Sequence, residues 1–145
     1  MTDSARRAVA DDLADLRGAI AWAEDLAVGA GISEDIRYNM QICLEEALAN
    51  LVLHGRKTAE AKDIVLELTF APPRATVTIS DRCEAYDILK AATPPPPSLD
   101  DMHEGGQGLR LIRAFTVLLA YDSDDSHNTL TMGFGPPSVS GGGVA

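Results

Sequence analysis

One stretch, residues 41–55 (QICLEEALANLVLHG), constrains the fold more than any other part of this 145-residue chain. On a helix with about 100° between successive residues, its apolar side chains would cover most of the surface. A helix of that kind is normally buried. Its narrow polar sector carries Glu46 and Asn50, spaced i, i+4, whereas Glu45 is turned by roughly 100° toward solvent. We therefore expect a carboxylate and an amide to share one face of a buried helix, where both are costly to desolvate.

Length and composition predict one cytoplasmic domain without disulfides or structural metal. The chain is long enough to bury a core, and its two cysteines, Cys43 and Cys83, suit a reducing compartment. No apolar run has the length of a membrane span or the flanks of a signal peptide. The formal charge of −10 and the lack of a basic patch argue against a nucleic-acid partner. The three histidines lie far apart in sequence, which argues against a zinc site.

Hydrophobic periodicity predicts two helices in the first half of the chain. Apolar residues recur at helical spacing over residues 11–28, and glycines at 29 and 31 end that helix. Ser33, followed by two acidic residues, is a suitable N-cap for the long second helix. We expect that helix to run to His54 and to stop at Gly55.

Runs of β-branched and apolar residues predict two hairpins. The first hairpin turns at residues 71–73, and its second strand leads directly into Asp81. The second hairpin turns at residues 122–128, which are rich in Asp, Ser and Asn. A further short strand before the first helix has weaker support. The strand-like runs are residues 6–10, 64–70, 74–80, 117–121 and 129–134.

A long loop and a glycine-rich turn follow the first hairpin. After a helical turn or two from Asp87, four prolines at 94–97 exclude regular helix and central strand, so residues 91–104 form a loop. Loops of this length are commonly lids or binding loops, although a stiff linker is the alternative. The loop leads to a glycine-rich turn that opens a helix, Gly105-Gly106-Gln107-Gly108-Leu109. We expect the domain to span residues 1–135 and residues 136–145 to form a disordered tail.

Each candidate site group has a plain structural explanation when it is taken alone. A glycine turn is often only flexible, an Asp at a strand end often caps a turn, and an i, i+4 Glu–Asn pair often forms a local hydrogen bond. The groups also suit nucleotide chemistry. Glycine N–H groups at a helix start bind phosphates, and Asp81 can accept a hydrogen bond from the adenine amine. Asn50 offers a hard oxygen to magnesium, and Glu46 could take a proton from a hydroxyl.

In this order, the motifs resemble those of the histidine-kinase-like ATPase superfamily, whose nucleotide site is called the Bergerat fold. The length of the chain and the local sequence of its motifs are most similar to those of bacterial anti-sigma factor serine/threonine kinases of partner-switching systems, over roughly residues 6–134. Residues 46–50 with His54 are similar to the N box, Ser80-Asp81 to the start of the G1 box and residues 105–109 to the G2 box. The final strand motif, residues 127–131, contains Thr129 and resembles the one that lies near the phosphates in these kinases.

The sequence departs from the family pattern at Cys83. The family usually has Asp-x-Gly in the G1 box, and here the three residues are Asp81-Arg82-Cys83. If the position required positive φ or a bare Cα, a cysteine would cost on the order of 1 kcal/mol and weaken ATP binding. We interpret both cysteines as packing residues, because no basic neighbour in the sequence activates them.

The resemblance implies a two-layer α+β sandwich with a mixed, mostly antiparallel sheet and its helices on one face. ATP and Mg²⁺ would bind between the helices and the lid. Glu46 would be the catalytic residue and Asn50 the magnesium ligand, within a nucleotide site formed by Asn50, Asp81, Cys83, Gly105, Gly106, Gln107, Gly108, Leu109 and Thr129. The activity implied is phosphoryl transfer to a serine or threonine of an anti-anti-sigma protein, alternating with capture of a sigma factor.

Two alternatives remain open at the level of sequence. The first is a non-catalytic or nucleotide-gated protein-binding module with the same fold, which Cys83 favours and the Glu46–Asn50 pair opposes. The second is an ATP-hydrolysing conformational switch, which the lack of a further transducer domain opposes. We expect no direct contact with nucleic acid or membrane, and the resemblance leaves open whether the chain forms a homodimer.

Overall fold

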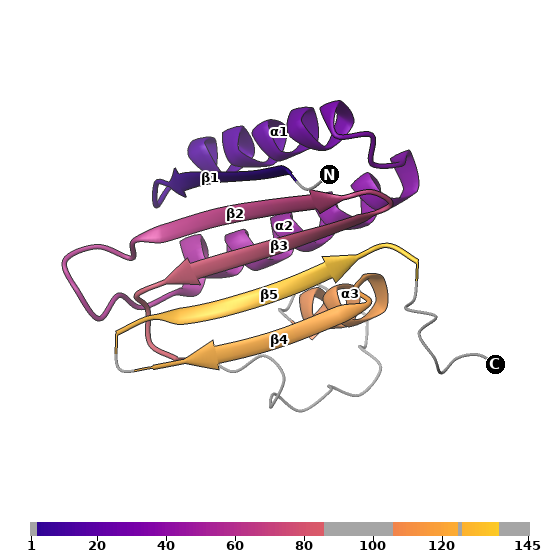
Figure 1. The fold of residues 1–145 in the computed structure, drawn as a ribbon. Helices are drawn as coiled ribbons and strands as arrows, with labels where there is room; N and C mark the ends of the chain where they lie inside the picture. The colour runs from indigo at the N-terminus through magenta and orange to yellow at the C-terminus, as the bar shows by residue number, and fades with distance from the viewer. Residues whose placement is uncertain (1–2, 86–105, 125, 137–145) are drawn as a thin grey trace.

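Five strands form one antiparallel sheet in the computed structural model, which describes residues 3–85, 106–124 and 126–136 (Figure 1). The strand order is β1-β2-β3-β5-β4, and all four pairings between described strands are antiparallel. The prediction of a mostly antiparallel sheet is therefore confirmed, but no parallel pair joins the described strands. The strands are β1 (Asp3–Val9), β2 (Ile64–Ala71), β3 (Arg74–Asp81), β4 (Leu118–Ser123) and β5 (Asn128–Phe134).

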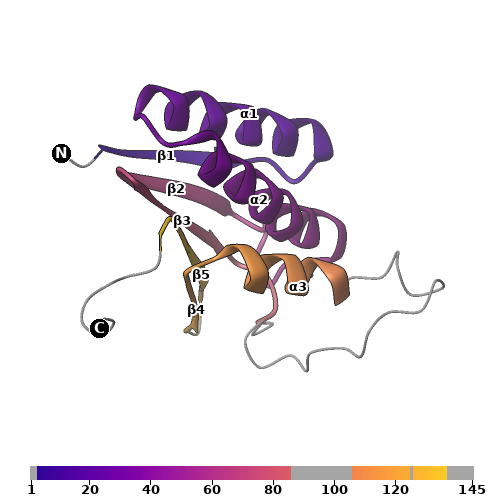
Figure 2. The ribbon, with the colours of Figure 1, turned by 90° about the vertical axis from the view of Figure 1, so that its right-hand side faces the viewer.

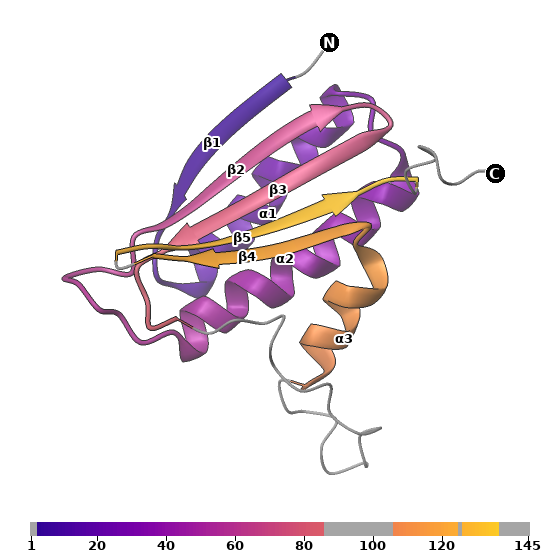
Figure 3. The same ribbon diagram turned by 60° about the horizontal axis from the view of Figure 1, so that its bottom comes forward.

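Three helices cover one face of this sheet, so the predicted two-layer α+β architecture is confirmed (Figure 2). They are α1 (Leu13–Gly29), α2 (Glu34–His54) and α3 (Gly106–Phe115). The long α2 lies across the sheet with α1 on one side and α3 on the other (Figure 3). This central position explains why the sequence of α2 is apolar over most of its surface, because the sheet and both neighbouring helices need apolar partners.

The ends of the helices follow the predicted capping signals. The Ser33 hydroxyl accepts a hydrogen bond from the Ile36 N–H at 3.4 Å and begins α2. The same helix ends at His54, where the N–H of Gly55 donates to the carbonyl of Leu51 at 3.0 Å. The first helix begins two residues later than predicted, because Asp12 takes the N-cap position.

The weakly supported first strand is real and longer than predicted. It begins at Asp3 and pairs with β2 along its whole length, from Asp3 opposite Phe70 to Val9 opposite Ile64. Most of its side chains are exposed or half-buried, so its own pattern of apolar residues gives little signal. Pairing with the neighbouring strand fixes β1, and a single-strand pattern cannot show such pairing.

Alternation on the inner strands builds the core beneath the helices. Leu66 and Leu68 of β2, and Val77 and Ile79 of β3, are buried on the face that the helices cover. The α2 side chains that meet them are Met40, Leu44 and Leu48, each 0% exposed. None of the described helices is long and apolar enough to cross a membrane. The predicted turn from Asp87, the lid at 91–104 and residues 137–145 of the predicted tail at 136–145 lie outside the described residues.

Candidate functional site

The polar sector of α2 that carries Glu46 and Asn50 turns toward α3. Cys43, one turn before Glu46 on the same face, approaches α3, and its Sγ lies 3.9 Å from the carbonyl oxygen of Leu111. Glu46 is half-buried and Asn50 is exposed. The prediction that both groups pay a high desolvation cost is therefore wrong for Asn50, because α2 extends past the cover of its neighbours toward its C-terminal end.

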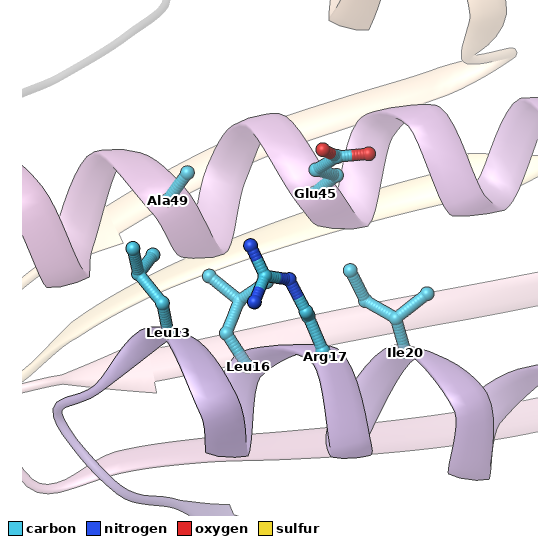
Figure 4. A pocket seen from close by; sticks show the side chains of 6 residues that line it. All are labelled: Leu13, Leu16, Arg17, Ile20, Glu45 and Ala49. Carbon is cyan, nitrogen blue, oxygen red and sulfur yellow. The ribbon is translucent and has the colours of Figure 1, made fainter.

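An adjacent sector of α2 faces α1 and is a different surface. A shallow hollow lies between the two helices and includes Glu45 and Ala49 (Figure 4). Glu45 is exposed, as predicted, and lies one residue round the helix from Glu46. The hollow is lined by Leu13, Leu16, Arg17, Ile20, Glu45 and Ala49. It brings together none of the predicted site residues.

Asp81 ends β3 as predicted, and its side chain is held in the protein interior. The residue is only 6% exposed. Its Oδ1 accepts hydrogen bonds from the backbone N–H of Cys83 at 2.8 Å and from the side-chain amide of Asn128 at 2.9 Å. A buried carboxylate requires such donors, because a buried polar group without partners is costly. Asp81 therefore presents a carboxylate of fixed orientation at the end of the sheet.

Cys83 adopts an ordinary backbone conformation. Among the described residues other than glycine, only Asp63 has a positive φ. Cys83 does not have a positive φ, so its backbone is not strained in the way that a cysteine in a glycine conformation would be. The Cys83 sulfur packs against the end of α2, where it lies 2.9 Å from the point that a Cβ on Gly55 would occupy. A small residue at 55 makes room for the thiol at 83.

Neither cysteine has the character of a nucleophile. Burial raises the pKa of the Cys43 thiol to about 12, and the negative charge of Glu46 adds to this effect. Burial likewise raises the pKa of Cys83 to about 11, with a further contribution from Asp81. Both thiols are thus protonated at neutral pH, which agrees with their interpretation as packing residues.

Hydrogen bonds tie the turn after Asp81 to the segment that follows α2. The N–H of Thr58 donates to the carbonyl of Arg82 at 2.9 Å, and the N–H of Glu84 donates to the carbonyl of Arg56 at 2.7 Å. The N–H of Arg82 donates in turn to the carbonyl of Lys62 at 2.6 Å. The end of the helix that carries Asn50 and the turn that carries Asp81 therefore form one hydrogen-bonded unit.

Lys62 is a structural residue of this unit that the sequence analysis missed. Its ammonium donates to the last carbonyls of α2, Leu51 at 2.8 Å and Val52 at 3.0 Å, and to the carboxylate of Asp11 at 2.9 Å. A cation at a helix C-terminus interacts favourably with the carbonyls of the last turn and with the helix dipole. The available signal was a lysine eight residues beyond a helix end, which is too distant to recognise as a cap.

The register of β5 places Asn128, rather than Thr129, beside Asp81. Asn128 lies opposite Asp81 and Thr129 lies opposite Ser80. Successive side chains alternate across a sheet, so Thr129 is on the face away from the helices and from Asp81. Asn128 is another functional candidate that the sequence analysis missed. Alternation could have revealed it, because buried Met132 and Phe134 lie four and six residues further along the same strand.

The glycine-rich segment is part of a helix rather than a turn before it. Gly106, Gln107, Gly108 and Leu109 all lie in the first turn of α3, and Gly105 lies outside the described residues. The expected opening turn is wrong to that extent. The first N–H groups of any helix lack partners within the helix, so these residues can still present donors to an anion.

Comparison with known proteins identifies this arrangement. A family model described as a histidine kinase-like ATPase domain matches residues 9–134. The chain belongs to the histidine kinase-like ATPase family. It is also 36% identical over 115 residues to the serine/threonine-protein kinase BtrW of Bordetella bronchiseptica, an alignment that covers 79% of this chain and 81% of that protein.

The described part of this ATPase domain contains donors for a nucleotide but no preformed metal cage. No group of three or more His, Cys, Asp or Glu side chains among the described residues could hold an ion. A hard cation such as Mg²⁺ is usually bound by one or two protein oxygens together with substrate phosphates. Asn50, exposed on the sector of α2 that faces α3, fits that mode of binding.

Proposed function

We propose that this protein is a MgATP-dependent serine/threonine kinase of a partner-switching system. In this proposal it phosphorylates an anti-anti-sigma protein and, in the alternating state, captures a sigma factor. The observation that carries the proposal is the hydrogen-bonded unit that joins the end of α2 to the turn after Asp81. That unit links the segment after α2, the helix that carries the candidate metal ligand Asn50, to the turn after the candidate base-recognising carboxylate Asp81. The similarity to a protein named as a serine/threonine kinase supports the choice of reaction.

Each residue has a separate part in the proposed transfer. Asp81 accepts a hydrogen bond from the adenine amine, and the N–H groups of the first turn of α3 bind phosphate oxygens. Asn50 holds Mg²⁺, which neutralises charge on the phosphates when it is bound. Glu46, on the same face of α2 as Asn50, orients the acceptor hydroxyl or takes its proton. Phosphoryl transfer depends mainly on positioning and charge neutralisation, and these groups can provide both.

A non-catalytic binding module has less support from the geometry than the kinase. Its main sequence argument was strain or crowding at Cys83, and that residue has no positive φ and directs its sulfur toward Gly55. The Glu46–Asn50 pair has no evident use in such a module. The proposed kinase would act in the cytoplasm, and dimerisation is not needed for any step described above.

Transfer of labelled phosphate tests the proposal directly. The purified protein is incubated with ATP labelled at the γ position, Mg²⁺ and a single-domain anti-anti-sigma protein that it binds. The expected result is label on a serine or threonine of that partner, absent when Mg²⁺ is chelated and strongly reduced in Asn50→Ala. If the wild-type protein binds ATP and the partner but transfers no label, the proposed kinase activity is wrong.

A further inference from the structure

Three polar side chains form a hydrogen-bonded row across the end of the sheet. Asn128 of β5 lies opposite Asp81 of β3 on one side and opposite Ser123 of β4 on the other. The Asn128 amide donates to Asp81 Oδ1 at 2.9 Å, and the Ser123 hydroxyl donates to Asn128 Oδ1 at 2.7 Å. Alternating apolar residues continue from this row into the core, so it marks the polar end of a buried layer.

The chemistry of the neighbours fixes the orientation of the Asn128 amide. Its Nδ2 faces two groups that can only accept, the Asp81 carboxylate at 2.9 Å and the Cys83 carbonyl at 2.8 Å. The amide nitrogen has two hydrogens and can serve both acceptors. Its oxygen is then directed at Ser123, whose hydroxyl has to be the donor. Rotation of the amide by 180° would set an oxygen against two acceptors, so this orientation is strongly preferred.

These bonds hold the Asp81 carboxylate from one side. Two donors, the Cys83 N–H and the Asn128 amide, reach the same oxygen, Oδ1, and the Cys83 thiol also hydrogen-bonds to this carboxylate. Asp81 and Asn128 are 6% and 5% exposed, so neither loses its partner to water easily. The second carboxylate oxygen, Oδ2, is the one that we assign to a ligand. A carboxylate held in this way accepts from an amine and repels a carbonyl oxygen.

We propose that Asn128, supported by Ser123, is a positioning residue that sets Asp81 for a purine with an amine at position 6 and against one with a carbonyl there. The inference rests on the proposed function, because it assumes that Asp81 meets the base. Asn128 itself bonds to Asp81 and to the turn at Cys83, and it acts through them. Its loss should change discrimination between bases more than it changes binding of the phosphates.

Paired titrations with ATP and inosine triphosphate test this inference. Inosine triphosphate keeps the sugar and phosphates of ATP but has a carbonyl in place of the amine. Wild type should prefer ATP at least tenfold. Asn128→Ala should lose about tenfold in ATP affinity and change its inosine triphosphate affinity less than twofold, which brings the ratio near one. Equal weakening of both nucleotides would show a general structural effect and overturn the inference.

Ser123→Ala provides a milder variant that does not depend on the folding of Asn128→Ala. Ser123 is exposed and its removal leaves no core cavity. We expect a smaller loss of preference for ATP, about threefold, and no additional loss when Asn128 is already alanine. Ser126→Ala is the matched control, because Ser126 bonds to Asp124 within the β4–β5 connection and does not touch Asp81. Equal effects of Ser123→Ala and Ser126→Ala would contradict the claim that the hydrogen bonds from Ser123 through Asn128 to Asp81 set the preference for ATP.

The outcomes separate this inference from the proposed function. If wild type and Asp81→Asn bind ATP and inosine triphosphate equally well, Asp81 does not recognise the base. The role of Asp81 in the proposed function and the positioning role of Asn128 are then both wrong. If wild type prefers ATP and Asn128→Ala keeps the same preference, Asp81 recognises the base without help from Asn128. Only the positioning role is then overturned.

Discussion

Both cysteines are buried, and burial is the main reason that the pKa of each thiol is raised. Cys43 lies one turn before Glu46 on the same face of α2, and Cys83 follows Asp81 by two residues. Nearby carboxylates therefore oppose formation of either thiolate. Thiolate is the reactive form of cysteine. The two residues that could have suggested redox chemistry therefore serve the packing around the site.

The first prediction is that both thiols react slowly in the folded protein. At pH 8, a disulfide reagent such as Ellman's reagent should label Cys43 and Cys83 far more slowly than it labels the same protein in concentrated urea. The pKa values of about 12 and about 11 and the burial of both side chains cause this protection. Rapid labelling of Cys83 in the folded protein would contradict the packing of its sulfur against Gly55.

The second prediction follows from the direction of these shifts. A raised pKa in the folded state contributes stability that is fully present below the unfolded value of 9.0 and is lost as pH rises toward about 11 for Cys83 and about 12 for Cys43. The urea midpoint should therefore fall between pH 8 and pH 10.5. The fall should be smaller in the Cys43→Ala/Cys83→Ala double variant, which controls for titration of lysine and tyrosine.

Single residues were predictable where a local pattern determined them. The i, i+4 spacing of Glu46 and Asn50 placed them on one face, and the end of a β-rich run placed Asp81. Exposure of Asn50 was not predictable, because it depends on how far α1 and α3 cover α2. The place of Asn128 beside Asp81 was missed for a similar reason, since the motif was considered as a string of residues and the strand alternation within it was overlooked.

At the scale of elements, the end of α2 is where helix, sheet and site meet. Gly55 has an ordinary φ of −66°, so it is required here for space and not for conformation. A Cβ at this position would lie 2.6 Å from the carbonyl oxygen of Leu51 and 2.9 Å from the sulfur of Cys83. The turn after Asp81 can approach the helix because this side chain is missing.

The third prediction is that Gly55→Ala destabilises the fold by about 1–3 kcal/mol in urea unfolding, as overpacking does. Cys83→Gly should not restore the loss, because the clash with the Leu51 carbonyl remains. Gly29→Ala is the matched control, since a Cβ there would meet nothing within 4 Å. Its effect should stay within about 0.5 kcal/mol. Equal effects of the two substitutions would contradict the close approach.

The fourth prediction concerns the lysine that caps the same helix. Lys62→Met keeps the apolar stem but removes the donor to the Leu51 and Val52 carbonyls and the ion pair with Asp11. It should cost about 1–2 kcal/mol in urea unfolding. Lys57→Met is its control, because the Lys57 ammonium bonds only to the exposed carbonyl of Glu60 among the described residues. A loss as large in the control would show that general charge, and not the cap, is responsible.

Elements were predictable where their signals were local. Capping residues and turn residues gave the two long helices and both hairpins to within a few residues. The first strand was uncertain because it depends on pairing with β2, and the start of α3 was misplaced because glycine is a poor helix former that this helix nevertheless includes.

At the scale of the whole molecule, the antiparallel sheet with three helices on one face places the N-box helix at the centre (Figure 2). The resemblance carried by the order of the motifs was enough to predict this architecture and the family. The motifs could not predict how the end of α2 is connected to the turn after Asp81. The hydrogen bonds between residues 55–63 and the turn at 82–84 join backbone groups that are distant in sequence. The same backbone contacts make the site a property of the folded domain rather than of any motif.

The measurement that tests the central claim most directly separates ATP binding from phosphoryl transfer in one variant. Glu46→Gln keeps the size of the side chain and removes its charge, so it should bind ATP with an affinity within about threefold of wild type. Transfer of labelled γ-phosphate to the partner protein should fall by about 10²-fold or more, as expected when a general base is lost. Unchanged transfer by Glu46→Gln, at unchanged ATP affinity, would contradict the proposed role of Glu46 on the central helix.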